Sequence, residues 1–473
     1  MPLIILLAFV LRLINIDKPE GLWNDEYVSW FVASTPFIKG FWQEVLKQCH
    51  MPLYYLYLKP FAGCSDLVLR LTSVIPSVLS VYVMYLVGKE FSKKTAVYAG
   101  LVTAVLSFLV YYGQEVRFYS LLFLFSALLL LFTMKLLNGK KGWIGYIISS
   151  LLILFTHVLG GIYVFFNTVY VLYKKKNLPK FVVVFPVLLL LLPVGIHIFR
   201  MLPSSQWWGE FSYTNILFLF SDFFSPILTN NVNAPPEFFY KKDLLWLLLM
   251  TVPTLIGFCG LLRGAKKQRG LFGVCLAVIL VMAILAVSGK LVFITKYAIE
   301  ILPVFILLFV LGINDKLFVL FITFHLFAIF TPYYVTNMPR TEGHKIVCDI
   351  LNKQEPDKIV YTYYSKDRFA RYLDEDVPSF WIDKTMRFVY LECPADILNE
   401  ICIGERVSVV FLDSVSFVPD NMIEEAKNCN LPEMFVTFSI IKNALVKELN
   451  DNYKDFDVKK NGDWTVITAT RFK

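Results

Sequence analysis

Long apolar runs and short polar loops alternate along most of the chain. The runs lie near residues 2–16, 67–88, 95–112, 118–137, 143–157, 159–173, 181–199, 243–262, 270–288, 297–312 and 316–333. A helix that crosses the hydrocarbon of a membrane needs about 20 apolar residues, and several runs are shorter than that. The pair on either side of residues 157–161 fits one re-entrant element as well as two spans. The pattern predicts a polytopic α-helical membrane protein with about 11 transmembrane helices.

The pattern changes beyond the last apolar run. From about Thr341 onward, short runs rich in β-branched and aromatic residues alternate with amphipathic segments. The predicted strands are KIVYTYY, RFVYLE, RVSVVFLD and WTVITATRF, and the predicted helices are GHKIVCDILNK, KDRFARYLD, PADILNEIC and NMIEEAKNC. This alternation predicts an α/β sandwich with a mainly parallel sheet. We therefore expect a membrane domain over residues 1–334 and an α/β domain over residues 335–473.

Charged residues are distributed unevenly between these two parts. Hydrophobic residues make up 57% of the chain and charged residues 17%, whereas soluble domains carry about 25% charged residues. Residues 335–473 hold 18 basic and 23 acidic side chains, so the net charge of +8 comes from basic loops of the membrane part. The charge therefore gives no reason to expect a nucleic-acid partner.

The loops between the apolar runs alternate in charge. One set is basic, and the positive-inside rule places it in the cytoplasm together with the N-terminus. Its members are Lys89, Lys93, Lys94, Lys140, Lys141, Lys174, Lys175, Lys176, Lys180, Arg263, Lys266, Lys267, Arg269 and Lys316. The other side then holds the first outer loop, 17–66, the loops 113–117, 200–240 and 289–296, and the C-terminal domain. This predicts a multi-pass protein of the cytoplasmic (inner) membrane with an extracytoplasmic, periplasmic C-terminal domain.

Two details of the first segments affect this topology. The first run lacks a basic leading region and a small-residue cleavage site, and Arg12 interrupts it, so we expect a short span and not a signal peptide. Cys49 and Cys64 share the first outer loop. They pair if that compartment is oxidising, and they stay as thiols otherwise.

An acidic pair, Asp25 and Glu26, follows the first run in the segment Trp23-Asn24-Asp25-Glu26-Tyr27. Carboxylates beside a bilayer are costly to desolvate, so they should face water or a protein cavity. Adjacent residues point about 100° apart on a helix, which favours different roles for the two. The simpler interpretation is a solvated loop start or a helix cap with Asn24.

Other polar groups are predicted on the same outer side as this pair. They are His50, Arg70, Gln114, Glu115, Arg117, His157 and Lys296. Each has a structural alternative. Glu115 and Arg117 fit a helix start with a snorkelling arginine, Lys296 fits an interfacial anchor, and a lone histidine is usually structural. Together they favour an anionic lipid that carries a sugar, because Arg and Lys pair with phosphate and a carboxylate can deprotonate an acceptor.

Six segments, in order, resemble motifs of the GT-C fold membrane glycosyltransferases. The resemblance is strongest to the branch that contains protein O-mannosyltransferases and bacterial lipid A aminoarabinose transferases. The segments are LRLINIDKPEGLWNDEYVSW, HMPLYYLYLKPF, DLVLRLTSVIPSVLSVYVMYLVGKEF, YYGQEVRFYSLL, FTHVLGG and TKYAIEILP, and they cover most of residues 1–312.

The resemblance implies a role for several of these residues. Asp25 would be the catalytic carboxylate, with Glu26 as its partner in the catalytic loop. Arg117, Lys296 and Arg70 would bind the donor phosphate. The remaining residues, which would line the cavity and position donor or acceptor, are His50, Tyr54, Tyr55, Gln114, Glu115, Tyr119, His157 and Tyr297. Lys296 stands where the family often has arginine, so the charge is kept and the bidentate fork is lost. Met51 replaces the family's first proline, and Val158 replaces a tyrosine.

The family uses a polyprenyl-phosphate sugar as donor, so the resemblance implies hexosyl or pentosyl transfer to a lipid, glycan or protein acceptor. Membrane lipids are the other expected partner. The sequence assigns no cofactor and leaves a divalent metal open, because acidic residues are present without a fixed set of ligands. The α/β domain is expected to dock the acceptor, to cap the site or to give structural support. The competing hypotheses are a lipid-linked sugar flippase or transporter and a non-catalytic envelope assembly protein.

Overall fold

A computed structural model describes thirteen segments of the chain. They are residues 1–18, 21–48, 51–175, 213–228, 243–288, 293–336, 344–361, 371–373, 379–381, 405–412, 445–447, 449–461 and 464–471. The chain forms two compact units. The membrane unit comprises Met1–Asp17 and Val28–Pro339, and the C-terminal unit comprises Lys18–Tyr27 and Arg340–Lys473. The segment that carries the acidic pair therefore belongs to the C-terminal unit, although it is far from it in sequence.

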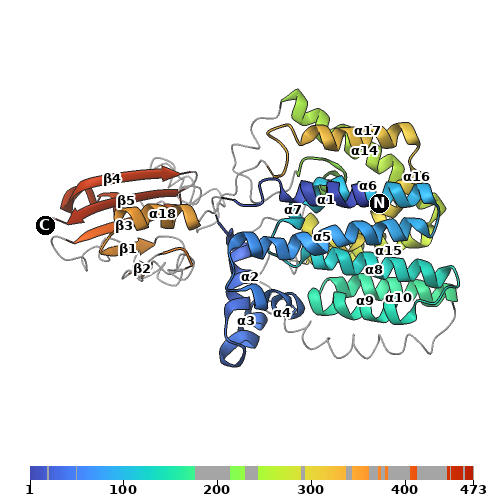
Figure 1. The fold of residues 1–473 in the computed structure, drawn as a ribbon, viewed down its shortest axis with the longest axis horizontal. Coiled ribbons are helices and arrows are strands. Elements are labelled where there is room, and N and C mark those ends of the chain that lie inside the picture. The colour runs from blue at the N-terminus through green and yellow to red at the C-terminus, as the bar shows by residue number, and fades with distance from the viewer. Residues whose placement is uncertain are drawn as a thin grey trace. The chain divides into compact units, whose positions relative to one another are not determined.

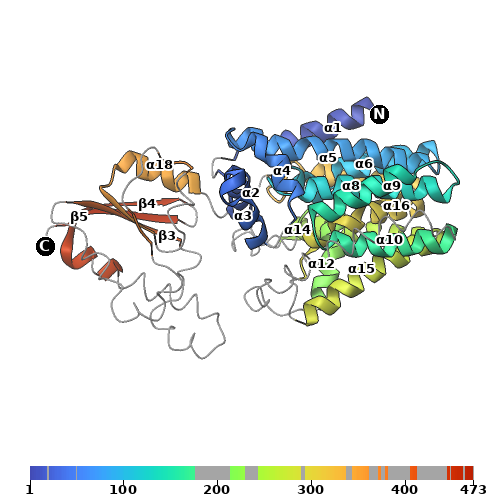
Figure 2. The same ribbon diagram turned by 90° about the horizontal axis from the view of Figure 1, so that it is seen from below.

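The membrane unit is a bundle of helices, most of them roughly parallel (Figures 1 and 2). Its first half contains α1 (Pro2–Leu13), α2 (Asn24–Ser34, shared with the other unit), η1 (Phe37–Phe41), α3 (Trp42–Lys47), α4 (Leu53–Leu58), η2 (Lys59–Phe61), α5 (Asp66–Lys89), α6 (Lys93–Val105), α7 (Ser107–Gly113) and α8 (Tyr119–Leu137). Its second half contains α9 (Trp143–Thr156), α10 (Gly160–Lys175), α12 (Tyr213–Phe224), α14 (Leu244–Lys267), α15 (Arg269–Val287), η5 (Thr295–Ile301), α16 (Leu302–Gly312) and α17 (Asp315–Ala328).

Within the described segments, five helical stretches are long and apolar enough to cross a membrane. They are α5, α8, α14, α15 and the joined η5 and α16, and the bent pair α6–α7 makes a sixth if it counts as one span. The polytopic helical character is therefore confirmed, whereas the predicted count of about 11 is not. The run at 181–199 lies outside the described residues. The runs at 143–157 and 159–173 form two helices, α9 and α10, that pack against each other.

The break between α6 and α7 interrupts a run that we predicted as one helix, 95–112. The two helices meet at 57°, and Leu106 lies between them in a non-helical conformation. A helix end leaves backbone carbonyls without partners. Here the fully buried Arg12 of α1 donates to the carbonyls of Thr103 and Ala104 at 3.1 and 3.0 Å, and to Ser77 Oγ of α5 at 2.6 Å. The charge that interrupts the first apolar run thus stabilises a break in a neighbouring one.

Helices α14 and α16 approach each other through glycine. Gly260 and Gly264 are one turn apart on α14 and face Leu308, Phe309 and Gly312 of α16. A Cβ atom on Gly264 would overlap the Leu308 carbonyl, and one on Gly312 would overlap the Gly260 carbonyl. Small residues at this spacing let helix backbones pack closely within a membrane.

Gly264→Ala is therefore expected to destabilise the membrane unit by about 1–3 kcal/mol, because the overlap is with backbone that has no rotamer to change. The measurement is the thermal unfolding midpoint of the purified protein in detergent. Gly273→Ala on α15 is the matched control, since a Cβ there meets nothing within 4 Å. Equal midpoints for the two variants would contradict this packing.

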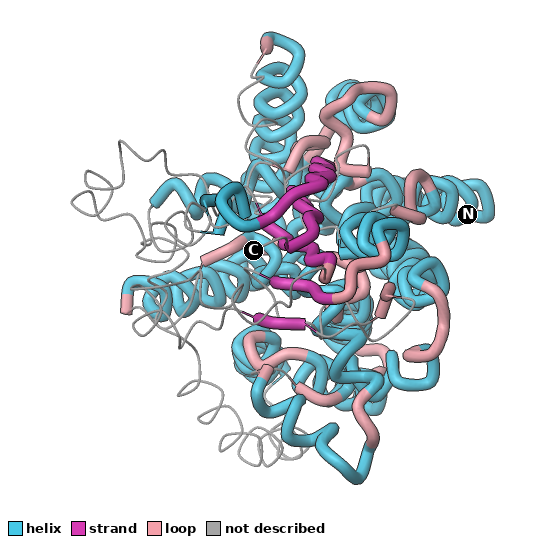
Figure 3. The backbone as a smooth tube through the Cα atoms, turned by 90° about the vertical axis from the view of Figure 1, so that its left-hand side faces the viewer, coloured by secondary structure: helices cyan, strands magenta, loops and turns pink. Residues whose placement is uncertain are grey.

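The described part of the C-terminal unit includes helix α18, helical residues at 445–447 and 449–452, and a five-stranded sheet (Figure 3). The elements are α18 (His344–Gln354), β1 (Lys358–Tyr361), β2 (Ser379–Trp381), β3 (Arg406–Leu412), β4 (Tyr453–Asn461) and β5 (Trp464–Arg471), and the strand order is β2-β1-β3-β5-β4. The pairs β1–β2 and β1–β3 are parallel, but β3–β5 and β4–β5 are antiparallel. The predicted α/β organisation is present, and the prediction of a mainly parallel sheet is wrong.

The antiparallel edge has a simple cause. Strands β4 and β5 follow each other with only residues 462 and 463 between them, and so short a connection permits only antiparallel pairing. β4 was not predicted because it carries charge along its length, as edge strands commonly do. Residues 371–373, inside a predicted helix, form a turn. The predicted strand 387–392 and the predicted helices 394–402 and 421–429 lie outside the described residues.

A chain of side-chain hydrogen bonds joins α18 to the sheet. Gln354 donates to Asp457 at 3.0 Å and accepts from Thr468 at 2.5 Å, and Thr468 in turn lies 2.6 Å from Ser408. The hydrogen bond from Gln354 lowers the pKa of the Asp457 carboxyl. The helix is thereby held over β3, β4 and β5.

Candidate active site

The acidic pair opens helix α2, and its two carboxylates have different surroundings. Glu26 is fully buried, and its carboxylate accepts a hydrogen bond from the backbone N–H of Trp23 at 3.3 Å. Glu26 is the third residue of the helix, so this is the reach-back contact of a capping box. Asp25 is half-buried. Glu26 therefore stabilises the start of the helix, and Asp25 is the more accessible of the two.

The segment before α2 packs against α18 and Tyr372 of the C-terminal unit. The backbone N–H of Leu22 donates to the Tyr372 hydroxyl at 2.9 Å, and the Leu22 carbonyl lies 3.5 Å from Nδ1 of His344. The rings of Tyr27 and His344 lie 6.1 Å apart. Gly21 has a φ of +78°, which favours glycine. These contacts fix the entry to the acidic helix within the C-terminal unit.

Gly21→Ala is expected to release this segment. The added Cβ would lie 2.7 Å from Lys345 Cβ and 2.9 Å from the Tyr372 hydroxyl, and the backbone would be strained as well. We expect faster hydrogen–deuterium exchange over residues 18–27, corresponding to about 1–3 kcal/mol of lost local stability. Gly63→Ala in the same outer loop is the control, because nothing lies within 4 Å of its Cβ position. Unchanged exchange in Gly21→Ala would refute the anchoring.

Two of the predicted residues hold the chain where it leaves α1. Gln114 donates to the carbonyls of Arg12 and Ile14 at 3.0 and 2.7 Å, and Arg70 donates to the carbonyl of Ile16 at 2.9 Å. Both side chains are almost fully buried. These contacts support the backbone that follows α1, and the predicted phosphate contact of Arg70 stays a prediction.

The predicted short loop 113–117 is the bend between α7 and α8, and it presents several of the predicted residues. Glu115 is fully buried and Arg117 is 6% exposed. Arg117 Nη1 donates to Ser29 Oγ of α2 at 3.2 Å, and its guanidinium lies 5.4 Å from the ring of Phe118. Arg117 therefore ties the bend to the part of α2 that belongs to the membrane unit.

Rings and cations from four other parts of the membrane unit gather around this bend. His157, between α9 and α10, stacks on Phe118 at 4.5 Å and lies parallel to Tyr297 at 6.1 Å. The ammonium of Lys296 lies 5.9 Å from the ring of Tyr119 and 5.8 Å from that of Tyr297. We call this group the aromatic–cation cluster, which comprises Tyr54, Arg117, Phe118, Tyr119, His157, Lys296 and Tyr297.

Tyr54 joins the cluster through Phe118, and Tyr55 packs edge-on to Tyr54. Both tyrosines are buried and lie on α4, which packs against α9. The structure thus brings together residues from α4, the 114–118 bend, α8, the turn before α10 and η5. These residues extend from Tyr54 to Tyr297 in sequence, and Arg117, His157 and Lys296 among them were predicted on one side of the membrane.

Sequence reasoning missed an acidic residue beside this cluster. Asp222 of α12 is 3% exposed and accepts a hydrogen bond from Thr295 Oγ1 at 2.7 Å, next to Lys296. The phenol of Tyr112 lies within electrostatic range of both Glu115 and Asp222. Asp222 falls in a stretch that we predicted as loop 200–240 and that forms helix α12 from Tyr213 to Phe224. A lone acidic residue among phenylalanines was the available signal.

The remaining expectations concern His50, the Cys49–Cys64 pair and a divalent metal. His50 and Cys49 lie outside the described residues, so neither the histidine's role nor the Cys49–Cys64 pair is tested. Among the residues whose placement is described, no three His, Cys, Asp or Glu side chains come close enough to hold a metal ion. A divalent metal therefore has no ligand set in that part of the chain.

The fold resembles that of solved membrane glycosyltransferases. ArnT from Cupriavidus metallidurans in the apo state is 11% identical, with a TM-score of 0.53 over 99% of this chain and 97% of that one. The same protein bound to undecaprenyl phosphate is 13% identical, with a TM-score of 0.51 and the same coverage. An Archaeoglobus fulgidus oligosaccharyltransferase tethered with an acceptor peptide is 11% identical, with a TM-score of 0.45 over 99% of this chain and 74% of that one.

The sequence itself matches no family model and no curated protein. At these identities the structural likeness to ArnT shows the fold alone. The chain has the GT-C fold that its sequence motifs resembled, and it is a polytopic helical membrane protein.

Proposed function

We propose that the protein is an integral-membrane glycosyltransferase. It would move a hexosyl or pentosyl group from a polyprenyl-phosphate donor to a lipid, glycan or protein acceptor on the outer side of the cytoplasmic membrane. The observation that carries this proposal is the aromatic–cation cluster, which holds Arg117 and Lys296 among aromatic rings within a GT-C bundle. The sequence motifs and the undecaprenyl phosphate bound to ArnT support the same class of donor.

Arg117 and Lys296 suit the charge that develops during such a transfer. The donor phosphodiester carries one negative charge, and the departing polyprenyl phosphate acquires a second as the bond to the sugar breaks. Cations in a site of low dielectric stabilise this added charge more than they would in water. Arg117 can offer a planar fork to two phosphate oxygens, whereas Lys296 acts as a point charge.

Asp25 is the proposed base. Its carboxylate would accept the proton of the acceptor hydroxyl or amine as that group attacks the anomeric carbon. The new bond forms on one face of the sugar while the bond to phosphate breaks on the other, so the anomeric centre inverts, as is typical of the family that the sequence resembles. Support comes from the segment LRLINIDKPEGLWNDEYVSW, which resembles the Asp-Glu loop motif of that family, and from the greater accessibility of Asp25 compared with Glu26.

The aromatic side chains would position the two substrates. Tyr54, Tyr55, Tyr119, Tyr297 and His157 supply ring faces and hydroxyl groups around the two cations. Rings of this kind combine an apolar body for a prenyl chain with polar atoms for a sugar. Arg70 and Gln114 would act indirectly, by holding the backbone after α1.

Mass spectrometry of envelope glycolipids and glycoproteins tests the proposal in cells. Cells that lack the protein are expected to lose one sugar modification and to accumulate the matching polyprenyl-phosphate sugar. The accumulated lipid would identify the sugar, and the lost modification would identify the acceptor. Identical sugar modifications and donor levels in both cell types would contradict the proposal.

A further inference from the structure

A pocket of about 520 Å³ lies on the membrane unit where α14 ends and α15 begins. It is separate from the aromatic–cation cluster, and the proposed glycosyl transfer does not use it. Its lining consists of Cys259, Leu262, Arg263, Ala265, Lys266, Arg269 and Phe272. One rim is basic and the remaining wall is apolar, so the pocket combines positive charge with an apolar surface. Both helices that form it are long enough to cross a membrane.

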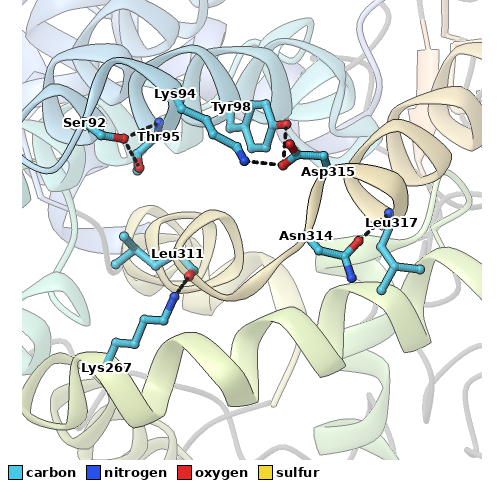
Figure 4. Close-up of polar contacts among 9 residues, drawn as sticks. All are labelled: Ser92, Lys94, Thr95, Tyr98, Lys267, Leu311, Asn314, Asp315 and Leu317. Atoms are coloured by element: carbon cyan, nitrogen blue, oxygen red, sulfur yellow. Dashed lines mark hydrogen bonds and ion pairs between the residues drawn. The ribbon is translucent and has the colours of Figure 1, made fainter.

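The three cations of this rim are not neutralised by the part of the chain that the structure describes. Arg263, Lys266 and Arg269 are exposed and make no ion pair or side-chain hydrogen bond with another described residue. Neighbouring lysines differ (Figure 4). Lys267 donates to the Leu311 carbonyl at 2.5 Å, and Lys94 pairs with Asp315. The three cations that line the pocket thus differ from these two lysines, whose ammonium groups have partners within the described residues.

The start of α15 adds to the positive potential. No side chain caps this helix, and its first residue is Arg269. A helix N-terminus carries a partial positive charge from free N–H groups, so a cation placed there is unfavourable unless an anion neutralises it. The helix runs for 19 residues, so its dipole is fully developed.

Apolar stripes extend from the basic rim along both helices. On α14, Leu255, Phe258 and Leu262 recur at helical spacing and are 63%, 37% and 41% exposed. On α15, Leu276 and Leu280 continue the stripe of Arg269 and Phe272 and are 47% and 60% exposed. Charge at one end and two exposed apolar stripes leading away from it match a phosphate group with attached acyl chains.

We propose that this pocket binds the headgroup of an anionic glycerophospholipid. The phosphate would lie among Arg263, Lys266, Arg269 and the first turn of α15, and the acyl chains would follow the stripes of α14 and α15. Basic pockets between membrane helices commonly hold such headgroups. A glycerophospholipid and free phosphate both carry an anionic phosphate group. Only the lipid also has acyl chains, which the apolar wall would contact.

The test uses the full chain purified in a non-ionic detergent. Phosphatidylglycerol, phosphatidylcholine or inorganic phosphate is added, and bound lipid is counted by native mass spectrometry together with the unfolding midpoint. We expect retained phosphatidylglycerol and a raised midpoint, with neither effect from the other two ligands. The variant Arg263→Gln/Lys266→Gln/Arg269→Gln should hold phosphatidylglycerol about tenfold to a hundredfold more weakly.

Two further variants make the result specific. Lys89→Gln/Lys93→Gln/Lys174→Gln removes as many exposed cations outside the pocket and should bind as the wild type does. Arg263→Lys/Arg269→Lys keeps all three charges and should also retain the lipid. Equal loss of lipid in the pocket and control variants would overturn the proposal in favour of diffuse surface charge. Equal stabilisation by inorganic phosphate would overturn it in favour of a simple anion site.

Discussion

Asp25→Asn is expected to lower sugar transfer by about 10²–10⁴-fold while leaving the protein folded. The substitution keeps the size and shape of the side chain but removes its capacity to accept a proton. Asp25 is half-buried at the start of α2, so the change neither creates a cavity nor removes the cap that Glu26 provides. The measurement is the rate of transfer by purified protein with saturating donor and acceptor.

The neighbouring carboxylate gives the control for this prediction. Glu26→Gln retains an oxygen that can accept from the Trp23 N–H, and glutamine occupies this capping position as well as glutamate does. We expect a much smaller loss of activity than for Asp25→Asn. A larger loss in Glu26→Gln, or wild-type transfer by Asp25→Asn, would remove Asp25 from the mechanism.

Arg117→Ala is expected to lower kcat/KM for the lipid-linked donor by about 10²–10³-fold, because it removes a cation from the site where charge develops. The variant also loses the hydrogen bond to Ser29, so Arg117→Lys is needed to separate charge from geometry. Lysine keeps the charge but not the fork, and an intermediate loss is expected.

Lys296, the other cation of the cluster, allows a control substitution that should preserve activity. Lys296→Arg keeps the charge and introduces the side chain that is common at this position in the family that the sequence motifs resemble, so transfer should be retained. If Arg117→Ala transfers sugar at the wild-type rate, the aromatic–cation cluster does not bind the donor phosphate.

The parts of the fold that were predictable are those with an uninterrupted apolar signal. Helices α5, α8, α14 and α15 follow runs long enough to cross a membrane. The α6–α7 break was not predictable, because it depends on Arg12, which reaches carbonyls more than ninety positions away in sequence. Strand β4 was not recognised in the sequence because it carries several charged residues, which an edge strand tolerates.

For the candidate site, the charge of the loops was the informative signal. It placed Arg117, His157 and Lys296 on one side of the membrane, and the structure brings all three into one cluster. The same reasoning could not distinguish Arg70 and Gln114 from the residues of the cluster. These two side chains donate to backbone carbonyls, and such contacts cannot be read from the sequence of side chains. Nor could it show that the segment Lys18–Tyr27 packs with the C-terminal unit, because those contacts join residues more than three hundred positions apart.

The most direct test of glycosyl transfer uses detergent-solubilised protein, because without a bilayer a flippase yields no product. The protein is mixed with a lipid extract from cells that lack it, and free polyprenyl phosphate and the sugar-modified acceptor are measured together by mass spectrometry. The proposed mechanism predicts equal release of both products with the wild type and almost none with Asp25→Asn. Absence of both products with the wild type, or equal release by Asp25→Asn, would contradict it.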